Sequence, residues 1–335
     1  MRWSDVHVTA SAMALGKAED TATAVSEGRY YPAFHAAHGY LSVSVADDDR
    51  PAMDMAVDAA RQALSRSRLN PADIGLVIHS SVDHQGPDDI PPASYIHGKA
   101  VGGRACAVEV KQACNGGIAA LELGSAYLTA MAPGSSVLIT TSDRCEPGTD
   151  RYRSSLGELA GDGATALILS RGGGVARVLS TAIVGDGSFL GLPVPAAQVP
   201  KTGTRQELLA EQRRRLQPML RAMSALQRES VDAALADAAT DGAGISRWVF
   251  ANVGLFLVDR KFRLAFDIDY SKTTWDWGRT VGHLNAGNQI AGFTHLIESG
   301  AIRPGDRIAL CGNGVGFSYG CAILEIAANP DWSSS

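Results

Sequence analysis

The chain has 335 residues, of which 45% are hydrophobic and 19% are charged, and its formal net charge is −5 at pH 7. This length and balance exclude an intrinsically disordered chain and indicate a folded enzyme with two ordinary domains or one large one. The weak negative charge provides no field that would attract nucleic acid or an acidic membrane surface, so we expect neither partner.

The first residues and the cysteines both predict a cytoplasmic protein. No apolar segment of signal-peptide length opens the chain, and no later window approaches about 18 uninterrupted apolar residues. The five cysteines form no CxxC pair and no cluster with histidines, so we expect neither a metal site nor a disulfide framework. A specialised cysteine in this chain would therefore be specialised by its thiol.

Helices and strands alternate through the first half of the chain. Apolar residues recur at helical spacing in two segments, and short apolar runs bounded by Asn-Pro and Pro-Gly turns read as strands. The expected elements are a helix over residues 51–64, a strand over 74–78, a helix that begins just after Cys114, and a strand over 137–140.

The second half repeats this order. The expected elements are a helix from Met219 towards Leu235, a strand over 248–253, a helix carrying Ile290, Phe293 and Ile297, and a strand over 308–311. His283 precedes the second of these helices much as Cys114 precedes its counterpart. A repeated α/β unit predicts two layers packed across a pseudo-two-fold axis, near which the two junctions would meet.

We therefore predict an α/β fold with two similar halves, residues 1–185 carrying the cysteine and residues 186–335 carrying the histidine. A region rich in Pro and Gly at its start, at about residues 190–212, is expected to join them.

Cys114 stands out by its context, in the run Ala-Cys-Asn-Gly-Gly at residues 113–117. The amides and the dipole of a helix N-terminus favour a thiolate, and the glycines leave room for backbone N–H groups to face a carbonyl oxygen. Free cysteines are most often small buried hydrophobic residues. The residues alone leave both interpretations open.

Three motifs resemble the thiolase superfamily, and specifically ketoacyl synthase III. They are Ala-Cys-Asn-Gly-Gly at 113–117, Gly-Asp-Gly-Ala at 161–164, and Gly-Asn-Gly-Val-Gly-Phe-Ser-Tyr-Gly at 312–320. The resemblance implies a duplicated thiolase fold in a five-layer αβαβα arrangement. It also implies a homodimer, with residues 83–93 as a source of contacts across the dimer, and no permanently bound cofactor. Cys114 would take an acyl group from a coenzyme A or phosphopantetheine (acyl-carrier-protein) thioester.

The chain departs from the condensing pattern of that family at both other catalytic positions. Where the family has Pro-His-Gln-Ala-Asn, this chain reads Ala-Asn-Val-Gly at 251–254, so Asn252 occupies the histidine position. Where the family has Gly-Asn-Thr-Ser, this chain reads Gly-His-Leu-Asn at 282–285, so His283 occupies the asparagine position. Histidine and asparagine have exchanged places.

The segment around His283 resembles a branch of antibiotic biosynthesis whose members transfer acyl groups without decarboxylation. That branch would have aspartate five residues after the histidine, where this chain has Asn288. We expect Asn288 to orient His283 by accepting from a ring N–H. By resemblance, the acyl oxygen would lie against the backbone N–H of Cys114 and the backbone near Val315, with Asn252 also near the substrate.

The predicted function is acyl transfer in natural-product (polyketide) biosynthesis, without decarboxylation, from Cys114 to a hydroxyl such as that of a sugar, or to a carrier-protein thiol. His283 is the expected acid and base. Two alternatives remain. One is a decarboxylating ketoacyl synthase III that primes polyketide or fatty-acid chains, and the other is a non-catalytic partner subunit of a synthase.

Other conspicuous residues have simpler interpretations. His295 is expected to be a partly buried helix residue, the Gly-Asp-Gly-Ala segment a structural turn, and His79 and His84 polar residues at a strand end and in a loop. The basic runs 213–215 and 260–263 could receive an acidic carrier protein or coenzyme A phosphates, although such runs are usually solvated helix faces.

Overall fold

The computed structural model describes residues 1–87, 89–146, 148–153, 158–189, 221, 223–330 and 332. The expected connecting region at 190–212 and the basic run at 213–215 lie outside these residues.

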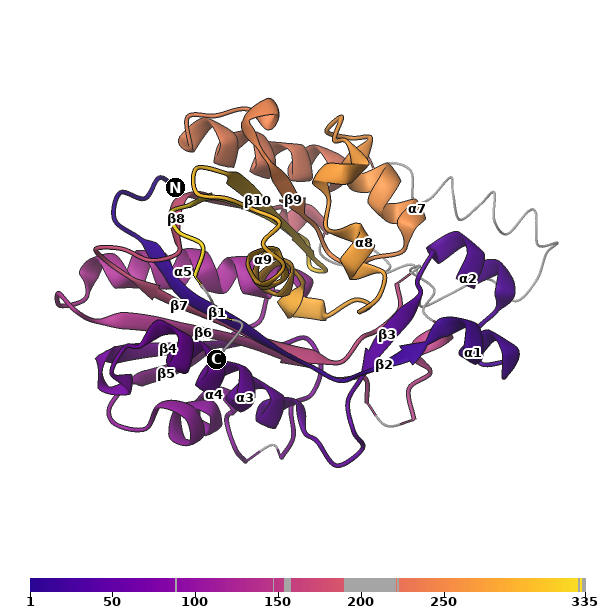
Figure 1. The fold of residues 1–335 in the computed structure, drawn as a ribbon, viewed down its shortest axis with the longest axis horizontal. Helices are drawn as coiled ribbons and strands as arrows, with labels where there is room; N and C mark the ends of the chain where they lie inside the picture. The colour runs from indigo at the N-terminus through magenta and orange to yellow at the C-terminus, as the bar shows by residue number, and fades with distance from the viewer. Residues whose placement is uncertain are drawn as a thin grey trace.

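In the part of the chain that the structure describes, nine strands form one hydrogen-bonded mixed sheet, in the order β5-β4-β6-β7-β1-β8-β11-β10-β9 (Figure 1). Their bounds are β1 (His7–Leu15), β4 (Ile74–Ser80), β5 (Cys106–Val110), β6 (Ser136–Asp143), β7 (Gly163–Ser170), β8 (Ala176–Gly185), β9 (Arg247–Val249), β10 (Arg307–Gly314) and β11 (Ser318–Ile326). Every residue of β6 and β7 is buried. Their two faces are therefore both covered, as the continuous apolar runs in the sequence suggest.

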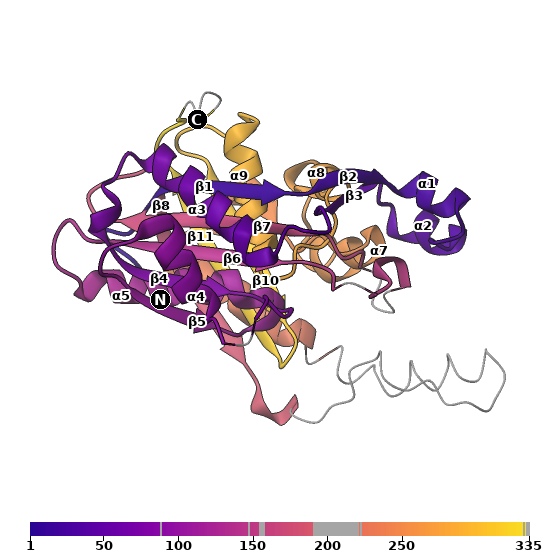
Figure 2. The same cartoon turned by 90° about the horizontal axis from the view of Figure 1, so that it is seen from below.

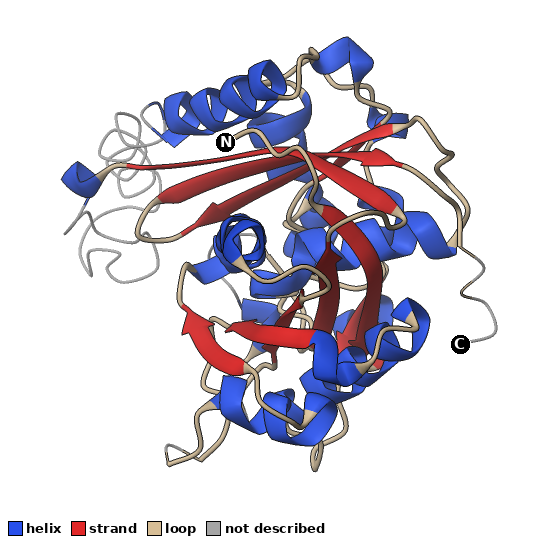
Figure 3. Cartoon of the chain, turned by 90° about the vertical axis from the view of Figure 1, so that its left-hand side faces the viewer, coloured by secondary structure: helices blue, strands red, loops and turns tan. Residues whose placement is uncertain are grey.

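The strand order reads as two mirrored sets, β4-β6-β7-β1 and β9-β10-β11-β8. In each set the first two strands are parallel and the following pairs are antiparallel. Only two residue pairs, His7 with Arg177 and Val8 with Ala176, join β1 to β8. The sheet therefore divides into two packed halves, which Figure 3 shows at an angle to each other. By pairing, β8 belongs with the second set, and the division at residues 185 and 186 remains a prediction.

Helices complete the five layers. The principal ones are α3 (Ala52–Ser67), α4 (Pro92–Ile96), α5 (Gly116–Ala130), α9 (Asn288–Glu298) and a helix over residues 223–237. Helices α3 and α4 cover the outer face of the first half-sheet, and the helix over 223–237 covers that of the second. Helices α5 and α9 lie between the half-sheets, where Ile118, Leu121 and Phe293 enter the central core. The expected αβαβα arrangement is confirmed.

A smaller unit projects from one end of this body (Figure 2). It consists of the two-stranded sheet of β2 (Lys17–Asp20) and β3 (Ser42–Val45), with α1 (Thr21–Ser26) and α2 (Pro32–His38) between them. Near it lie the short helices α7 (Leu255–Leu257) and α8 (Trp275–Gly278). None of the helices in the described part of the chain is both long and apolar enough to cross a membrane.

The strand predicted over residues 248–253 is shorter in the structure. Strand β9 ends at Val249, and residues 250–254 continue without regular structure towards α7. The backbone N–H of Asn252 donates to the Asn288 side chain instead of to a neighbouring strand. An apolar run could not reveal this, because the competing partner is a side chain 36 residues away.

Candidate active site

Cys114 lies in a tight 3-10 turn, residues Ala113–Asn115, that leads directly into α5. Ala113 adopts a left-handed backbone conformation with φ 48°, which is unfavourable for a residue other than glycine. A Cβ atom at Gly116 would lie 2.0 Å from Ser80 Oγ, and one at Gly117 would lie 2.6 Å from the carbonyl oxygen of Ala286. Gly116 therefore lets this turn pack against β4 of its own half, and Gly117 lets it pack against the facing half.

The facing turn repeats this geometry. Residues Asn285–Gly287 form a 3-10 turn before α9, and Asn285 is also left-handed, with φ 46°. Matching the two left-handed residues places Ala286, and not His283, opposite Cys114 in the repeat. His283 instead lies upstream of its turn, where its side chain can reach across to the cysteine.

His283 contacts Cys114 directly. Its Nε2 atom lies 3.3 Å from Cys114 Sγ, and its side chain is almost completely buried. The backbone of the segment 159–161 holds it, because His283 N donates to Leu159 O at 2.8 Å and His283 O accepts from Gly161 N at 3.0 Å. The structure thus brings together the two residues singled out as a nucleophile and its acid or base.

Asn288 lies behind His283, fully buried, with Nδ2 at 3.2 Å from His283 Nδ1. Its Oδ1 atom accepts from two backbone N–H groups, those of Leu284 at 3.0 Å and Asn252 at 3.1 Å. Its Nδ2 atom also donates to Asn285 O at 2.6 Å. These three backbone contacts distinguish the oxygen of the Asn288 amide from its nitrogen.

In the contact between Asn288 and His283, the donor and the acceptor are therefore the reverse of those expected. The amide nitrogen, not the oxygen, faces the ring, so Asn288 donates and Nδ1 of His283 accepts. A neutral imidazole that accepts at Nδ1 carries its proton on Nε2. In this state His283 presents an N–H donor to Cys114, whereas an aspartate at position 288 would favour the opposite tautomer.

Three carboxylates surround the thiol. Burial raises the pKa of Cys114, and Glu158, Asp143 and Asp83 raise it further. This raised pKa is opposite in direction to the thiolate expected at the helix N-terminus. Cys114 accordingly stays protonated near neutral pH until a base accepts its proton.

Two of these carboxylates are held by neighbouring groups. Asp83 Oδ2 accepts from Asn285 Nδ2 at 2.9 Å, while Asn285 Oδ1 faces Cys114 Sγ at 3.9 Å. Asp143 is fully buried and accepts from the backbone N–H groups of Val82, Asp83 and Ala286. Burial nevertheless raises the pKa of Asp143 to about 8.

Glu158 differs from the other two. Its Oε2 atom lies 3.6 Å from His283 Nε2, and its side chain is 25% exposed. It directly precedes the segment 159–161 that pairs with the His283 backbone.

The two residues expected at the substrate lie further out. Asn252 is buried, and its Nδ2 atom donates to Gly282 O at 3.0 Å. Among the contacts of the described residues, none joins Asn252 to Cys114. Val315 is half exposed and lines a cavity of about 510 Å³ that also reaches Gln112 and Ala113, next to the cysteine.

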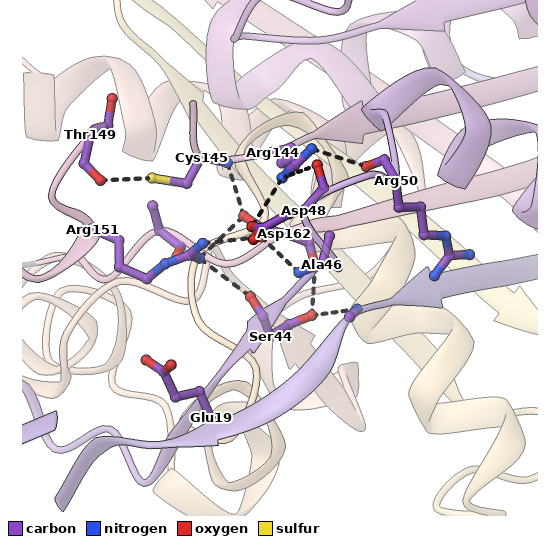
Figure 4. A network of polar contacts seen from close by, with 12 residues as sticks. Glu19, Ser44, Ala46, Asp48, Arg50, Arg144, Cys145, Thr149, Arg151 and Asp162 are labelled. Carbon is purple, nitrogen blue, oxygen red and sulfur yellow. Dashed lines mark hydrogen bonds and ion pairs between the residues drawn. The ribbon is translucent and has the colours of Figure 1, made fainter. Parts of the chain in front are cut away.

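The Gly-Asp-Gly-Ala motif has a structural explanation (Figure 4). Asp162 is buried and forms a two-pronged ion pair with Arg151, at 3.1 and 3.2 Å. Its carboxylate also accepts from the backbone N–H groups of Ala46 and Cys145. The motif thus joins three segments beside the segment 159–161 that pairs with the His283 backbone.

The remaining candidates lie outside this centre. His79 is fully buried beside Thr140, and burial lowers the pKa of its imidazole to about 3. His84 lines a separate surface cavity, and His295 stacks on Trp277. In the second basic run, Arg263 pairs with Asp259 on its own helix, as expected of a solvated face.

The sequence interpretation missed Glu158, Asp83, Asp143 and Asn285. Asn285 carried a weak signal, because asparagine tolerates the left-handed conformation better than most residues. Nothing local marks the three carboxylates, which approach Cys114 only through the packing of separate segments.

Comparisons with known proteins agree with this geometry. The family described as 3-oxoacyl-[acyl-carrier-protein (ACP)] synthase III matches residues 108–187, and its C-terminal family matches residues 235–326. The beta-ketoacyl-[acyl-carrier-protein] synthase III of Syntrophomonas wolfei is 26% identical, covering 88% of each chain.

Two solved structures extend the comparison. ChlB3, described as an acyltransferase, has a TM-score of 0.87 and 30% identity, covering 98% of this chain and 100% of its own. The 3-oxoacyl-[acyl-carrier-protein] synthase III of Aquifex aeolicus has a TM-score of 0.77 at 20% identity, covering 96% and 99%, which shows the shared fold. Fold and relatives together define an acyl-transferring enzyme of the thiolase fold. Within that class, the chain belongs to the ketoacyl synthase III-like family of the thiolase superfamily.

Proposed function

We propose that this enzyme transfers an acyl group from a coenzyme A or acyl-carrier-protein thioester, through Cys114, to a hydroxyl or to a carrier-protein thiol without decarboxylation. The observation that carries the proposal is that, among the residues the structure describes, one side-chain N–H donor contacts the cysteine, His283 Nε2 at 3.3 Å. The similarity to ChlB3, described as an acyltransferase, supports acyl transfer. By the resemblance of the segment around His283, we place the reaction in natural-product biosynthesis.

The arrangement around Cys114 favours transfer over decarboxylation. Loss of CO₂ from a malonyl group leaves an enolate, whose oxygen needs preorganised donors. The Asn252 amide, which occupies the position of the second donor, donates to Gly282 O instead. The Glu158 carboxylate beside His283 also opposes an anionic malonyl group.

The cavity beside Ala113 supports the proposed donors. It measures about 510 Å³ and opens between the turn that carries Cys114 and the glycine-rich loop at Val315. A pantetheine arm could approach the thiol from this side, and the backbone near Val315 could then contact the acyl oxygen. Lys111, on the rim, offers a cation for an acidic donor group.

We further propose a homodimer in the cytoplasm. Strand β5 is at the edge of the sheet, and Val108, Leu123 and Tyr127 are 39–51% exposed on β5 and the adjacent α5. An open edge with apolar neighbours favours pairing with a second copy. All five cysteines are free thiols, including Cys311 and Cys321 with sulfur atoms 3.8 Å apart, which fits a reducing compartment.

Intact-mass spectrometry tests the proposal. Wild type and Cys114→Ala are incubated with a panel of acyl-coenzyme A and acyl-carrier thioesters that includes malonyl. We expect an acyl adduct on wild type alone, with any malonyl adduct retaining its CO₂. Carbon–carbon condensation products would establish a decarboxylating synthase instead, and failure of every donor to label Cys114 would favour a non-catalytic partner subunit.

A further inference from the structure

The site has a donor at His283 but needs a proton acceptor. Transfer from Cys114 to a hydroxyl or thiol releases a proton from the incoming nucleophile, and a positioned base must take it. Asn288 donates to Nδ1 of His283, so the neutral ring carries a proton on Nε2 and cannot accept another there. If Nδ1 were protonated as well, its N–H would point at the N–H donor of Asn288 Nδ2.

We propose that Glu158 is the general base and acid of the transfer reaction, and that His283 serves as a fixed hydrogen-bond donor through Nε2. This inference rests on the proposed function and adds a catalytic residue to it. Glu158 Oε2 lies 3.6 Å from Nε2, and Nε2 lies 3.3 Å from Cys114 Sγ. The Nε2 atom of His283 therefore contacts both the Glu158 carboxylate and the Cys114 sulfur.

Backbone pairing places Glu158 beside His283. Leu159 O accepts from His283 N at 2.8 Å, so the residue before Leu159 is held alongside the histidine. With 25% of its side chain exposed, Glu158 can meet an acceptor that approaches from solvent. Asp83 and Asp143 are less suited, because they already accept from Asn285 and from three backbone N–H groups.

The proton balance closes over the two half-reactions. In the first, the proton of the Cys114 thiol passes to Glu158, the sulfur attacks the donor carbonyl, and the departing pantetheine thiolate takes the proton from Glu158. In the second, Glu158 takes the proton of the acceptor hydroxyl as its oxygen bonds to the acyl carbon. The C–S bond breaks, and the Cys114 thiolate accepts a hydrogen bond from Nε2 before the proton returns to it.

The test compares Glu158→Gln with wild type and with Glu146→Gln. Glu146 is an exposed carboxylate on the preceding loop and serves as a matched control. Each enzyme is loaded with acetyl groups from acetyl-N-acetylcysteamine or from 4-nitrophenyl acetate, and acetyl-Cys114 is then released by 1-propanol or by hydroxylamine. Nitrophenolate departs without a proton, so this ester needs Glu158 only as the base for the thiol. Hydroxylamine attacks without a base, so release by hydroxylamine bypasses Glu158.

We expect Glu158→Gln to slow acetylation by the thioester and release by propanol by at least about 100-fold, within the usual contribution of a general acid or base. Acetylation by the nitrophenyl ester should slow less than acetylation by the thioester, because only the acid role of Glu158 is bypassed, and release by hydroxylamine should stay within about threefold of wild type. Glu146→Gln should resemble wild type in all four reactions.

Each other outcome has a distinct meaning. If Glu158→Gln matches wild type with the thioester and propanol, or slows all four reactions equally, the role of Glu158 is refuted. If wild-type Cys114 accepts acetyl from neither donor, the proposed function itself fails, independently of Glu158.

Discussion

In the proposed mechanism, the orientation of the Asn288 amide decides how the acid–base chemistry is divided between His283 and Glu158. Asparagine and aspartate have the same shape, but only asparagine can donate to Nδ1 of His283. Two backbone N–H groups hold Asn288 Oδ1, and they leave Nδ2 to face the ring. A single substitution at position 288 should therefore reassign the proton between the two ring nitrogens.

Asn288→Asp should move the ring proton to Nδ1 and free Nε2 to act as a base. We expect Glu158→Gln to cost at least about tenfold less in propanol release on the Asn288→Asp background than on wild type. Nitrogen-15 NMR of His283 reports the tautomer directly, with Nε2–H in wild type and Nδ1–H in the variant. Equal losses on both backgrounds, or an Nδ1–H tautomer in wild type, would contradict the assignment.

Asp143 should make stability fall with rising pH. Burial raises its pKa from 3.8 to about 8, so the folded protein keeps a proton that the unfolded chain loses within this window. The contribution of protonated Asp143 to the unfolding free energy is then fully present below about pH 4 and is lost as the pH rises through about 8. Between pH 5 and pH 8, the unfolding free energy measured in urea should fall by at least about 1 kcal/mol more for wild type than for Asp143→Asn. The surface variant Asp73→Asn should follow wild type, and parallel curves for wild type and Asp143→Asn would exclude this role.

At the scale of elements, two turn-and-helix units meet face to face. The turn before α5 and the turn before α9 each contain a left-handed residue, and glycines allow their close approach. The proposed chemistry depends on this contact, since Cys114 comes from one unit and His283 from the segment before the other.

Gly117→Ala should disturb this contact. The added Cβ would lie 2.6 Å from Ala286 O, a backbone atom that cannot turn aside. We expect a loss of about 1–3 kcal/mol in unfolding free energy, typical of overpacking, together with slower acylation of Cys114. Gly98→Ala is the matched control, because its Cβ would meet nothing within 4 Å. Equal stabilities of the two variants would show that the facing turns can separate freely.

At the scale of the whole molecule, the first half-sheet ends in an open strand. Strand β5 pairs with β4 on one side, and Val108 with Tyr127 forms part of an apolar surface beside the other. A nine-stranded sheet with such an edge could extend into a second copy without rearrangement of either chain.

Val108→Lys combined with Tyr127→Glu should convert a dimer into a monomer. Sedimentation velocity at micromolar concentration measures the change, because charges at the centre of an apolar interface oppose its burial. Leu264→Lys, which alters an exposed apolar side chain elsewhere, should leave the dimer intact. A monomeric wild type would exclude the homodimer.

The sequence by itself determined the alternation of strands and helices, the repeat and the family. It also singled out Cys114 and His283, the two residues that contact each other at the candidate active site. These properties follow from apolar periodicity and from short contiguous motifs such as residues 113–117. Only the tertiary structure decided the polarity of the Asn288 contact, the raised pKa of Cys114 and the approach of Glu158. Each depends on groups that are distant in the chain but adjacent in the fold, such as the backbone N–H groups that orient Asn288, and no local pattern encodes them.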